Sequence, residues 1–347
     1  MPDNLKSNIF RSKAPLRIGL AGGGSDVAPY SDQFGGAILN ATLNLYAHAS
    51  IEPTEDAKVT FVLSDRKVTI EFPSEEKLPL NESCILHAGI YNRIVKDYSK
   101  KPLSFKLTTH VDAPPGSGLG TSSTLVVAIL GAFVEWLKLP LGDYDIAHLA
   151  YEIERIDLGM AGGKQDQYSA TFGGVNFMEF YKDDKVIVNP LRINDAYMNE
   201  LSHNLLLYYT ATSRESALII ASQQKNVRSG NTRSIEAMHQ MKHQAIMMKE
   251  ALLKGQLDKI GEILNFGWHY KKQMAEEITN PLVEKIYETA IAAGATGGKI
   301  SGAGGGGFMA FYCPGNSKHS VAESLIPFGG QVQRFEFTNS GLTTWTN

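Results

Sequence analysis

Residues 114–123 have the sequence PPGSGLGTSS, and an apolar run with helical spacing follows them as far as Leu137. The segment Leu103 to Thr109, just before them, alternates in the manner of a strand. This order predicts a strand, a glycine-rich loop and a helix that begins with three hydroxyl side chains. Glycines let a backbone approach phosphate oxygens closely, and free N–H groups at a helix start bind anions. We therefore expect a phosphate site at Pro115, Gly116, Ser117, Gly118, Leu119, Gly120, Thr121, Ser122 and Ser123.

The same loop has a plainer interpretation as a capped turn, because Ser and Thr commonly begin helices. It differs from a Walker A loop, since no Lys follows its last glycine, Gly120, and the spacing of a dinucleotide-binding GxGxxG loop is absent. P-loop and Rossmann enzymes are therefore disfavoured. For this loop taken alone, phosphate binding and a capped turn both stay open.

Two further loops are rich in glycine. Gly22-Gly23-Gly24-Ser25-Asp26 follows the apolar run Leu16 to Ala21, and GAGGGG at residues 302–307 separates two short apolar segments. Each glycine loses much conformational freedom on folding, so such runs are costly unless a backbone must approach something closely. We expect both loops to lie against a ligand or against the other loops.

The composition excludes several classes of protein. The chain has 347 residues, 43% hydrophobic and 20% charged, which favours two globular domains over a disordered chain. A net charge of −3 offers no basic field for nucleic acid, and two cysteines are too few for a disulfide scaffold. The longest uncharged apolar stretch, Leu125 to Val134, is about half of a membrane span. The first 13 residues lack the apolar core of a signal peptide, so we expect a cytoplasmic protein with no membrane or nucleic-acid partner.

The pattern along the chain predicts an α+β protein. Up to about residue 200, strand-like and helix-like segments alternate, whereas four helix-like segments follow between Ser216 and Ala293. The segments that alternate are Ala47 to Ile51, Val59 to Leu63 and Lys67 to Phe72, and further strands are predicted at Leu205 to Tyr209 and Gln331 to Phe337. We expect a domain at residues 1–200 and a second at residues 201–347.

The three loops together, in this order, resemble the GHMP kinase superfamily, which includes galactokinase and mevalonate kinase. Its motifs resemble the stretches Ala14 to Ile18 with Gly22 and Asp26, then Pro114 to Ser122, then Ile300 to Gly306. The resemblance covers nearly the whole chain. It implies an α+β fold of two halves, the first like domain 2 of ribosomal protein S5 and the second ferredoxin-like, with ATP and Mg²⁺ bound between them.

Within the superfamily, four stretches resemble the branch that phosphorylates the anomeric hydroxyl of a heptose 7-phosphate. They are Arg11 to Arg17, Ala21 to Asp26, Leu45 to His48 and Gly162 to Tyr168. The resemblance implies an ATP-dependent sugar kinase that makes the 1,7-bisphosphate used for nucleotide-activated heptose. Its partners would be the sugar phosphate and ATP, and a homodimer is left open.

The resemblance also assigns chemical roles. Asp166 stands seven residues before Gly173, at the offset of the catalytic aspartate, where a carboxylate can take or orient a hydroxyl proton. Arg17 occupies the position of a cation that neutralises charge on the moving phosphoryl group. Glu154 inherits the metal role, with Ser122 as its hydroxyl partner. Alone, Glu154 would be a solvated helix residue and Asp166 a turn or cap residue.

The acceptor sugar needs several polar contacts. Asp26 matches the position with which galactokinases hold their sugar, while Gly23 and Gly24 replace the Glu-His of that branch and argue against galactose. The other expected substrate residues are Lys164, Gly304 and Gly305. The cations available to bind the phosphate group of the acceptor are Lys13, Arg155, Lys164 and Arg214. We favour Lys164 because it precedes Asp166 by two residues. The weaker sugar-binding candidates are Tyr30, His48 and Gln165.

Two other functions stay open. One is a kinase for a different sugar, such as L-fucose, and the other is a non-catalytic relative that binds a ligand. The second would be expected to lack Asp166, Glu154 or the hydroxyl residues of the loop, and the sequence has all of them.

Overall fold

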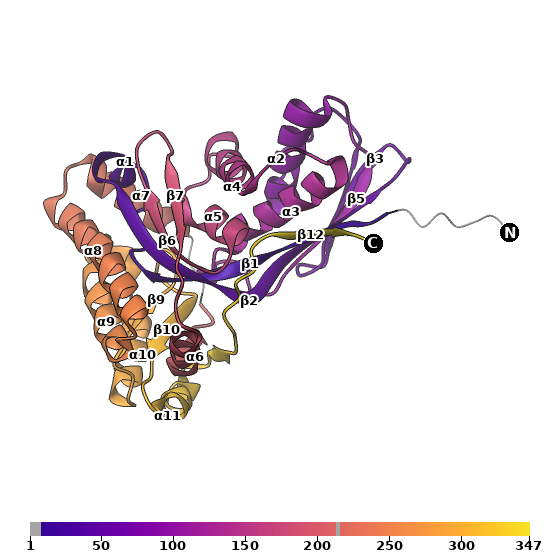
Figure 1. The fold of residues 1–347 in the computed structure, drawn as a ribbon. Helices are drawn as coiled ribbons and strands as arrows, with labels where there is room; N and C mark the ends of the chain where they lie inside the picture. Colours follow the sequence, from indigo (N-terminus) through magenta and orange to yellow (C-terminus); the bar gives the residue numbers. More distant parts are fainter. Residues whose placement is uncertain (1–7, 213–215) are drawn as a thin grey trace.

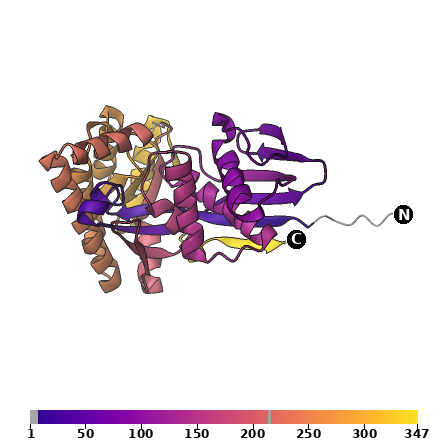
Figure 2. The ribbon, with the colours of Figure 1, turned by 90° about the horizontal axis from the view of Figure 1, so that it is seen from above.

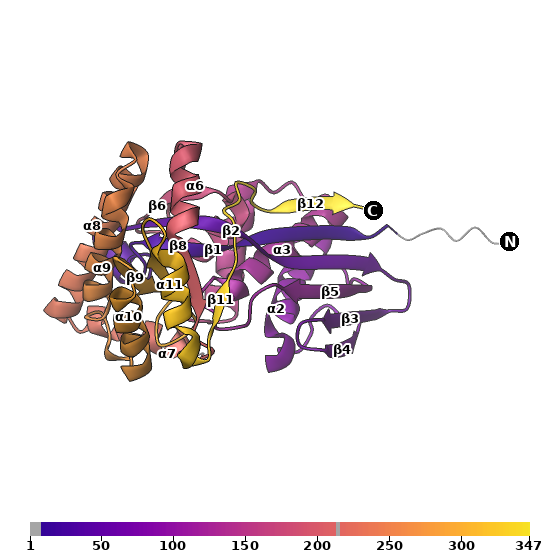
Figure 3. The same cartoon turned by 90° about the horizontal axis from the view of Figure 1, so that it is seen from below.

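The computed structural model describes residues 8–212 and 216–347, whose strands form two sheets (Figure 1). The larger sheet has the strand order β12-β1-β2-β5-β3-β4, and β6 and β7 extend it from β2. Its strands are β1 (Phe10–Ala21), β2 (Gly36–Pro53), β3 (Lys58–Leu63), β4 (Val68–Pro73), β5 (Phe105–Val111), β6 (Val175–Phe180), β7 (Val186–Pro190) and β12 (Thr343–Thr346). The strands of its main path lie side by side in Figure 3.

The long strand β2 connects two parts of this sheet. Its first residues, Gly36 to Ala41, pair with β6, whereas Ala47 to Pro53 pair with β5, and β1 runs antiparallel beside it. The sequence pattern predicted only Ala47 to Ile51 as a strand. The residues 36–43 are all buried, so they lack the alternation that identifies a half-exposed strand.

Helices cover one face of the larger sheet, as the view from above shows (Figure 2). Helix α3 packs on both β1 and β2, and eight of its residues between Val126 and Phe133 are buried. The helices of this half are α1 (Tyr30–Phe34), α2 (Ile85–Ile94), α3 (Thr121–Leu137), α4 (Asp143–Glu152) and α5 (Gln165–Phe172). Wider π-helical turns extend α2 at Val95–Ser99 and α4 at Ile153–Asp157, and a short 3-10 turn lies at Glu82–Cys84.

The second sheet has four antiparallel strands in the order β11-β8-β10-β9. Helices follow β8 and β10, which is the β-α-β-β-α-β order of a ferredoxin-like unit. Its strands are β8 (Leu205–Tyr209), β9 (Gly297–Ile300), β10 (Phe308–Tyr312) and β11 (Gln331–Gln333). The helices are α6 (Asp195–Asn204), α7 (Ser216–Arg228), α8 (Thr232–Lys254), α9 (Ile260–Lys271), α10 (Pro281–Ala292) and α11 (Ser317–Ser324). Short 3-10 turns lie at Leu257–Lys259, Glu276–Ile278 and Ile326–Phe328.

The predicted α+β class is confirmed, and the two halves share a core. Leu16 and Ile18 of β1 belong to one buried cluster with Leu207 of β8 and Leu264 of α9. The chain also returns at β12, which pairs with β1 (Figure 1). A domain boundary near residue 200 would fall inside α6 and stays a proposal. Residues 343–346 of the second half belong to the first sheet. No helix in residues 8–212 and 216–347 is long and apolar enough to cross a membrane.

The predicted last strand, Gln331 to Phe337, is wrong in its second half. Only the three residues of β11 pair with β8. Phe335 and Phe337 pack instead against the buried cluster that the two halves share. Phe337 forms only a single antiparallel bridge, to Leu43 of β2, so this half of the segment pairs with the first sheet and does not continue β11.

Candidate active site

The three glycine-rich loops meet at one cavity of about 630 Å³. Gly23 and Gly24 come from the loop after β1, Gly116 to Gly120 from the loop after β5, and Gly302 from the loop after β9. These loops are far apart in the sequence, and the shared core of the two halves holds them together. The expectation that the loops approach one another is met by this geometry.

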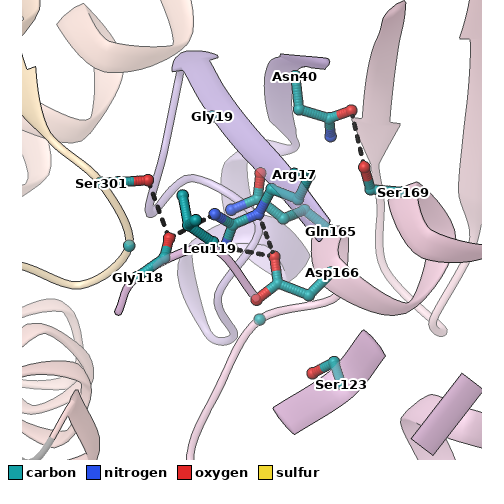
Figure 4. Close-up of polar contacts among 12 residues, drawn as sticks. Arg17, Gly19, Asn40, Gly118, Leu119, Ser123, Gln165, Asp166, Ser169 and Ser301 are labelled. Atoms are coloured by element: carbon teal, nitrogen blue, oxygen red, sulfur yellow. Dashed lines mark hydrogen bonds and ion pairs between the residues drawn. The ribbon is translucent and has the colours of Figure 1, made fainter. Parts of the chain in front are cut away.

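The second and third loops are joined directly. The carbonyl oxygen of Ser117 accepts the N–H of Phe308 at 2.9 Å. Figure 4 shows the other bond, in which the carbonyl oxygen of Gly118 accepts the Ser301 hydroxyl at 2.9 Å. Gly118 has a φ of +81°, and a Cβ there would lie 2.6 Å from the Ser301 carbonyl oxygen. Only glycine allows this approach. The two loops therefore form a single wall of the cavity.

The start of α3 has the properties of an anion site. Gly120 is its N-cap and supplies no side-chain hydrogen bond, so the first turn has no side-chain cap. Thr121, Ser122 and Ser123 line the cavity in this first turn. Uncapped N–H groups at the start of a 17-residue helix suit a phosphate group.

Not every residue of the predicted phosphate site reaches the cavity. The glycines and the hydroxyl residues of the loop do, but the side chains of Ser117 and Leu119 are fully buried in the protein. Pro115 lies instead at an adjoining cavity of about 210 Å³, which shares Gly116 and Ser122 with the main one. Its apolar wall includes Leu63, Ile85, Leu86, Val111, Leu125 and Met160.

The buried Glu154 and the half-buried Ser122 form a pair of oxygen ligands at the cavity. The Ser122 hydroxyl donates to Glu154 Oε1 at 3.0 Å, and the Glu154 side chain is inaccessible to solvent. Gln167 Nε2 donates to the other carboxylate oxygen, and Arg155 Nη1 lies 3.7 Å from Oε1. The π-helical turn at Ile153–Asp157 carries Glu154 to the cavity, and such turns are frequent at functional sites. Glu154 is therefore not a solvated helix residue.

Asp166 and Arg17 form an ion pair in the cavity (Figure 4). Arg17 Nε and Nη2 each lie 2.6 Å from Asp166 Oδ1, and Nη1 donates to the Gly118 carbonyl oxygen. Arg17 comes from β1 and is buried, whereas the Asp166 side chain is 23% exposed at the start of α5. Arg17 thus holds one oxygen of the Asp166 carboxylate and also binds the glycine loop. The Asp166 carboxylate remains accessible from the cavity.

Asp26 is a third carboxylate at the cavity, after Glu154 and Asp166. It is 3% exposed, and its Oδ2 accepts the backbone N–H groups of Lys164 and Gln165 at 2.9 and 3.1 Å. Burial raises the pKa of Asp26, and the charge of Asp166 acts in the same direction, while these N–H groups oppose it. A Cβ at Gly163 would lie 1.9 Å from Asp26 Oδ2, so glycine is required there for this contact.

Two buried lysines, Lys271 of α9 and Lys299 of β9, line the cavity and were missed by the sequence analysis. Burial, and then the charge of Arg17, lowers the pKa of Lys271 to about 8. Burial and the charges of Lys271 and Arg17 lower the pKa of Lys299 well below its usual value. The sequence did contain a sign that Lys271 is buried, because this lysine follows Trp268 by three residues and so shares the buried face of α9.

The prediction that the Lys164 side chain faces the substrate disagrees with its position. Its Nζ lies 2.7 Å from Asp184 and 3.7 Å from Asp32, and over the Tyr151 ring, away from the cavity. Lys164 is the N-cap of α5, whereas Asp166 is in the first turn, so the two side chains leave the helix in different directions. Only the backbone N–H of Lys164 contributes here, through Asp26.

Gly304 and Gly305 also lie outside the cavity. A Cβ at Gly304 would lie 2.8 Å from the carbonyl oxygen of Ile278, and the N–H of Gly305 donates to that same oxygen. These two glycines allow the loop to pack on the segment before α10. The cavity is reached by Gly302 and Ala303 instead.

The weaker candidates separate into two groups. Gln165 and Arg155 line the cavity, and the Gln165 Oε1 atom is buried without a hydrogen-bond partner in the described part of the chain. Tyr30, His48 and Lys13 are not at the cavity: Tyr30 bonds to His239, His48 lies near Asp112, and Lys13 lies over Tyr46. Arg214 lies outside the described residues.

Comparisons with known proteins match both halves of the chain to one family of kinases. Models of the N-terminal and C-terminal domains of GHMP kinases match residues 86–174 and 248–327. A D-glycero-alpha-D-manno-heptose 7-phosphate kinase from Campylobacter jejuni is 49% identical over 336 residues, which are 97% of this chain and 98% of the relative.

Two more relatives bear on the substrate. The crystal structure of a D-glycero-D-manno-heptose 1-phosphate kinase from Bacteroides thetaiotaomicron has 46% identity and a TM-score of 0.83, and 97% of this chain and 98% of that one are covered. An L-fucokinase/L-fucose-1-P guanylyltransferase from Bacteroides fragilis is 26% identical over 88% of this chain but only 35% of its own length.

Proposed function

The chain belongs to the GHMP kinase family, and from this premise we propose that it phosphorylates D-glycero-D-manno-heptose 7-phosphate at its anomeric C1 hydroxyl. Members of the family are ATP-dependent phosphotransferases, and so is this chain. The product would be the 1,7-bisphosphate, a precursor of nucleotide-activated heptose. A cytoplasmic location stays part of the proposal.

The observation that carries the proposal is the place of Asp166 in the cavity. Its carboxylate lies next to the glycine loop, since a Cβ at Gly120 would be 3.2 Å from Asp166 Cγ. Its charge also acts on Asp26, on the side of the cavity where Gly23 leaves room. A hydroxyl held by Asp26 would therefore meet a phosphoryl group held by the loop, with Asp166 beside both.

The transfer breaks one bond and forms another. The acceptor hydroxyl oxygen attacks the γ-phosphorus, the bond to the β–γ bridging oxygen breaks, and ADP leaves with that electron pair. The hydroxyl proton passes to the Asp166 carboxylate, whose orientation Arg17 fixes. The guanidinium of Arg17 also lies close enough to the loop to stabilise charge on the moving group. The adjoining apolar cavity is our candidate for the adenine base.

The residues Ser122 and Glu154 fit a magnesium ion. Both offer oxygen ligands, 3.0 Å apart, and Mg²⁺ takes one or two carboxylates together with phosphate oxygens and water. The described residues contain no cluster of three or more Asp, Glu, His or Cys for a metal, so the protein alone does not complete the set. When bound, Mg²⁺ would neutralise charge on the phosphates of ATP.

The alternative functions differ in the sugar that accepts the phosphoryl group. The name of the Bacteroides thetaiotaomicron relative gives the 1-phosphate instead of the 7-phosphate, and the B. fragilis relative names L-fucose. A heptose 1-phosphate has no free anomeric hydroxyl, so its phosphorylation would require a different oxygen at Asp166. A non-catalytic role is disfavoured because Asp166, Glu154 and the hydroxyl residues all line one cavity.

Substrate choice tests the proposal. With ATP and Mg²⁺, we expect kcat/KM for heptose 7-phosphate to exceed that for free heptose, mannose or L-fucose by about 10-fold or more, because an added charge-assisted contact is worth roughly that factor. A coupled assay of ADP release measures this. A preference for any unphosphorylated sugar would contradict the proposed acceptor.

The position of Asp26 can be tested through Gly163. In Gly163→Ala the new methyl group collides with Asp26 Oδ2 and displaces the carboxylate. We expect kcat/KM for the sugar to fall by up to about 100-fold, as for other small misplacements, with little change in KM for ATP. Gly142→Ala is the matched control, because a Cβ there meets no atom closer than 3.5 Å. Equal kinetics of both variants would remove Asp26 from the site.

A further inference from the structure

Within the part of the chain that the structure describes, the cavity is lined by four basic side chains, Arg17, Arg155, Lys271 and Lys299, but by only three carboxylates. Lys271 and Lys299 are 2% and 3% exposed, and among the described residues neither has an ion pair. Lys271 Nζ donates to the Gly302 carbonyl oxygen, and Lys299 Nζ to that of Gly19. A buried ammonium group is costly unless a negative charge compensates it. The arrangement therefore fits a ligand that brings an anion into the cavity.

Lys271 lies on the acceptor side of the cavity. A Cβ at Gly23 would be 3.8 Å from Lys271 Nζ, and the charge of Asp26 acts on this lysine. Gly23 and Asp26 both belong to the loop after β1, whereas Ser122 lies on α3 and Glu154 on the π-helical turn after α4. Arg155 also reaches this region, since its Nε donates to the Gly163 carbonyl oxygen at 3.3 Å, but its charge is partly compensated because Nη1 lies 3.7 Å from Glu154 Oε1.

A phosphorylated acceptor needs a cation that a neutral sugar does not. Its phosphate group carries between one and two negative charges near neutral pH, and it enters a cavity that already holds Asp26, Asp166 and the phosphates of ATP. Arg17 is already paired with Asp166. Without a further cation, electrostatic repulsion would oppose binding of the second substrate.

We propose that Lys271, with Lys299 close to it, binds the phosphate group that the sugar acceptor already carries. This inference rests on the proposed function, since it concerns the acceptor of the same reaction. Gln223 of α7, which is 2% exposed and lines the same side, is positioned to contribute an amide to that group. The lysine pair is then the feature that selects a sugar phosphate over a neutral sugar.

The test compares two substrates in one variant. Lys271→Met keeps the length and apolar part of the side chain and removes its charge, so it is suited to a buried site. We expect KM for heptose 7-phosphate to rise about 10- to 100-fold, with KM for ATP and kcat/KM for unphosphorylated heptose nearly unchanged. Lys271→Arg should recover part of the loss because it restores the charge.

The neighbouring lysine supplies the control. Lys272 follows on the same helix end, but it pairs with Glu284 at 3.2 Å and does not line the cavity. Lys272→Met should leave the preference for heptose 7-phosphate over heptose unchanged. Melting temperatures of both variants exclude a loss that is due to unfolding.

A pH series adds a second readout. The pKa of Lys271 is lowered to about 8, so the ammonium form is present at pH 7 and is lost as the pH rises above 8. The charged groups that face it are Arg17, Asp26 and Lys299. In the parent, KM for heptose 7-phosphate should rise above pH 8 while KM for heptose stays level. In Lys271→Met this difference should disappear.

The outcomes separate this inference from the proposed function. A parent enzyme that prefers heptose 7-phosphate, together with a Lys271→Met variant that keeps this preference, would overturn the phosphate subsite alone. A parent that prefers a neutral sugar would overturn the proposed acceptor and the subsite with it. An equal loss on heptose and heptose 7-phosphate in Lys271→Met would also overturn the subsite, because the lysine would then serve a step common to both sugars.

Discussion

In Asp166→Asn, kcat falls by about 100- to 10,000-fold while ATP binding stays close to that of the parent. Asn has nearly the same size, and its carbonyl oxygen still accepts from Arg17, so the cavity keeps its shape. It cannot take the proton of the acceptor hydroxyl, and it lacks the charge that faces Arg17. Steady-state kinetics with heptose 7-phosphate, together with ATP titration by calorimetry, measure the two effects separately.

The matched control for this variant is Asp56→Asn. Asp56 accepts hydrogen bonds from Thr54 and Ser104 in an exposed loop before β3, and it is not at the cavity. Its replacement should leave kcat within about twofold, because Asp56 does not line the cavity and surface substitutions change stability little. If Asp166→Asn kept activity within a few-fold of the parent, Asp166 would have no catalytic role.

The double variant Ser122→Ala, Glu154→Gln has the second large expected effect. It removes the hydroxyl and the carboxylate charge that would hold Mg²⁺, so that only phosphate oxygens and water remain as ligands. We expect the Mg²⁺ concentration for half-maximal activity to rise about 10-fold or more, and kcat to fall as well. A magnesium titration at fixed ATP measures the shift.

Glu152→Gln controls for a general effect of charge loss at this helix end. Glu152 lies two residues before Glu154 but pairs with Arg93 at 2.6 Å, away from the cavity. Its magnesium titration should match that of the parent. An unchanged titration in the double variant, with a normal melting temperature, would rule out Ser122 and Glu154 as metal ligands.

Much of the fold and of the site could be predicted because the decisive residues are close together in the sequence. The loop at residues 114–123 contains the glycines and the hydroxyl groups next to each other, and the motif positions of Arg17 and Asp166 are set by the resemblance. The structure brings these two residues into contact, although 149 positions separate them. The spacing of residues along the chain does not by itself predict an ion pair between Arg17 and Asp166.

The positions of some side chains could not be predicted, because tertiary packing decides whether each one reaches the cavity. Lys271 and Lys272 are adjacent and chemically identical, yet one is buried at the cavity and the other pairs with Glu284. Lys164 was predicted to face the substrate from its distance to Asp166 along the chain. Helix α5, which begins between them at Gln165, is only eight residues long and has a weak apolar pattern, so its effect on their directions was not visible.

Identification of the product tests the central claim most directly. The parent enzyme is incubated with ATP, Mg²⁺ and heptose 7-phosphate, and the product is examined by phosphorus and proton NMR. We predict one new phosphate group, coupled to the anomeric proton at C1, formed in equal amount with ADP. A new phosphate on any other oxygen, or release of ADP without a phosphorylated sugar, would contradict the account.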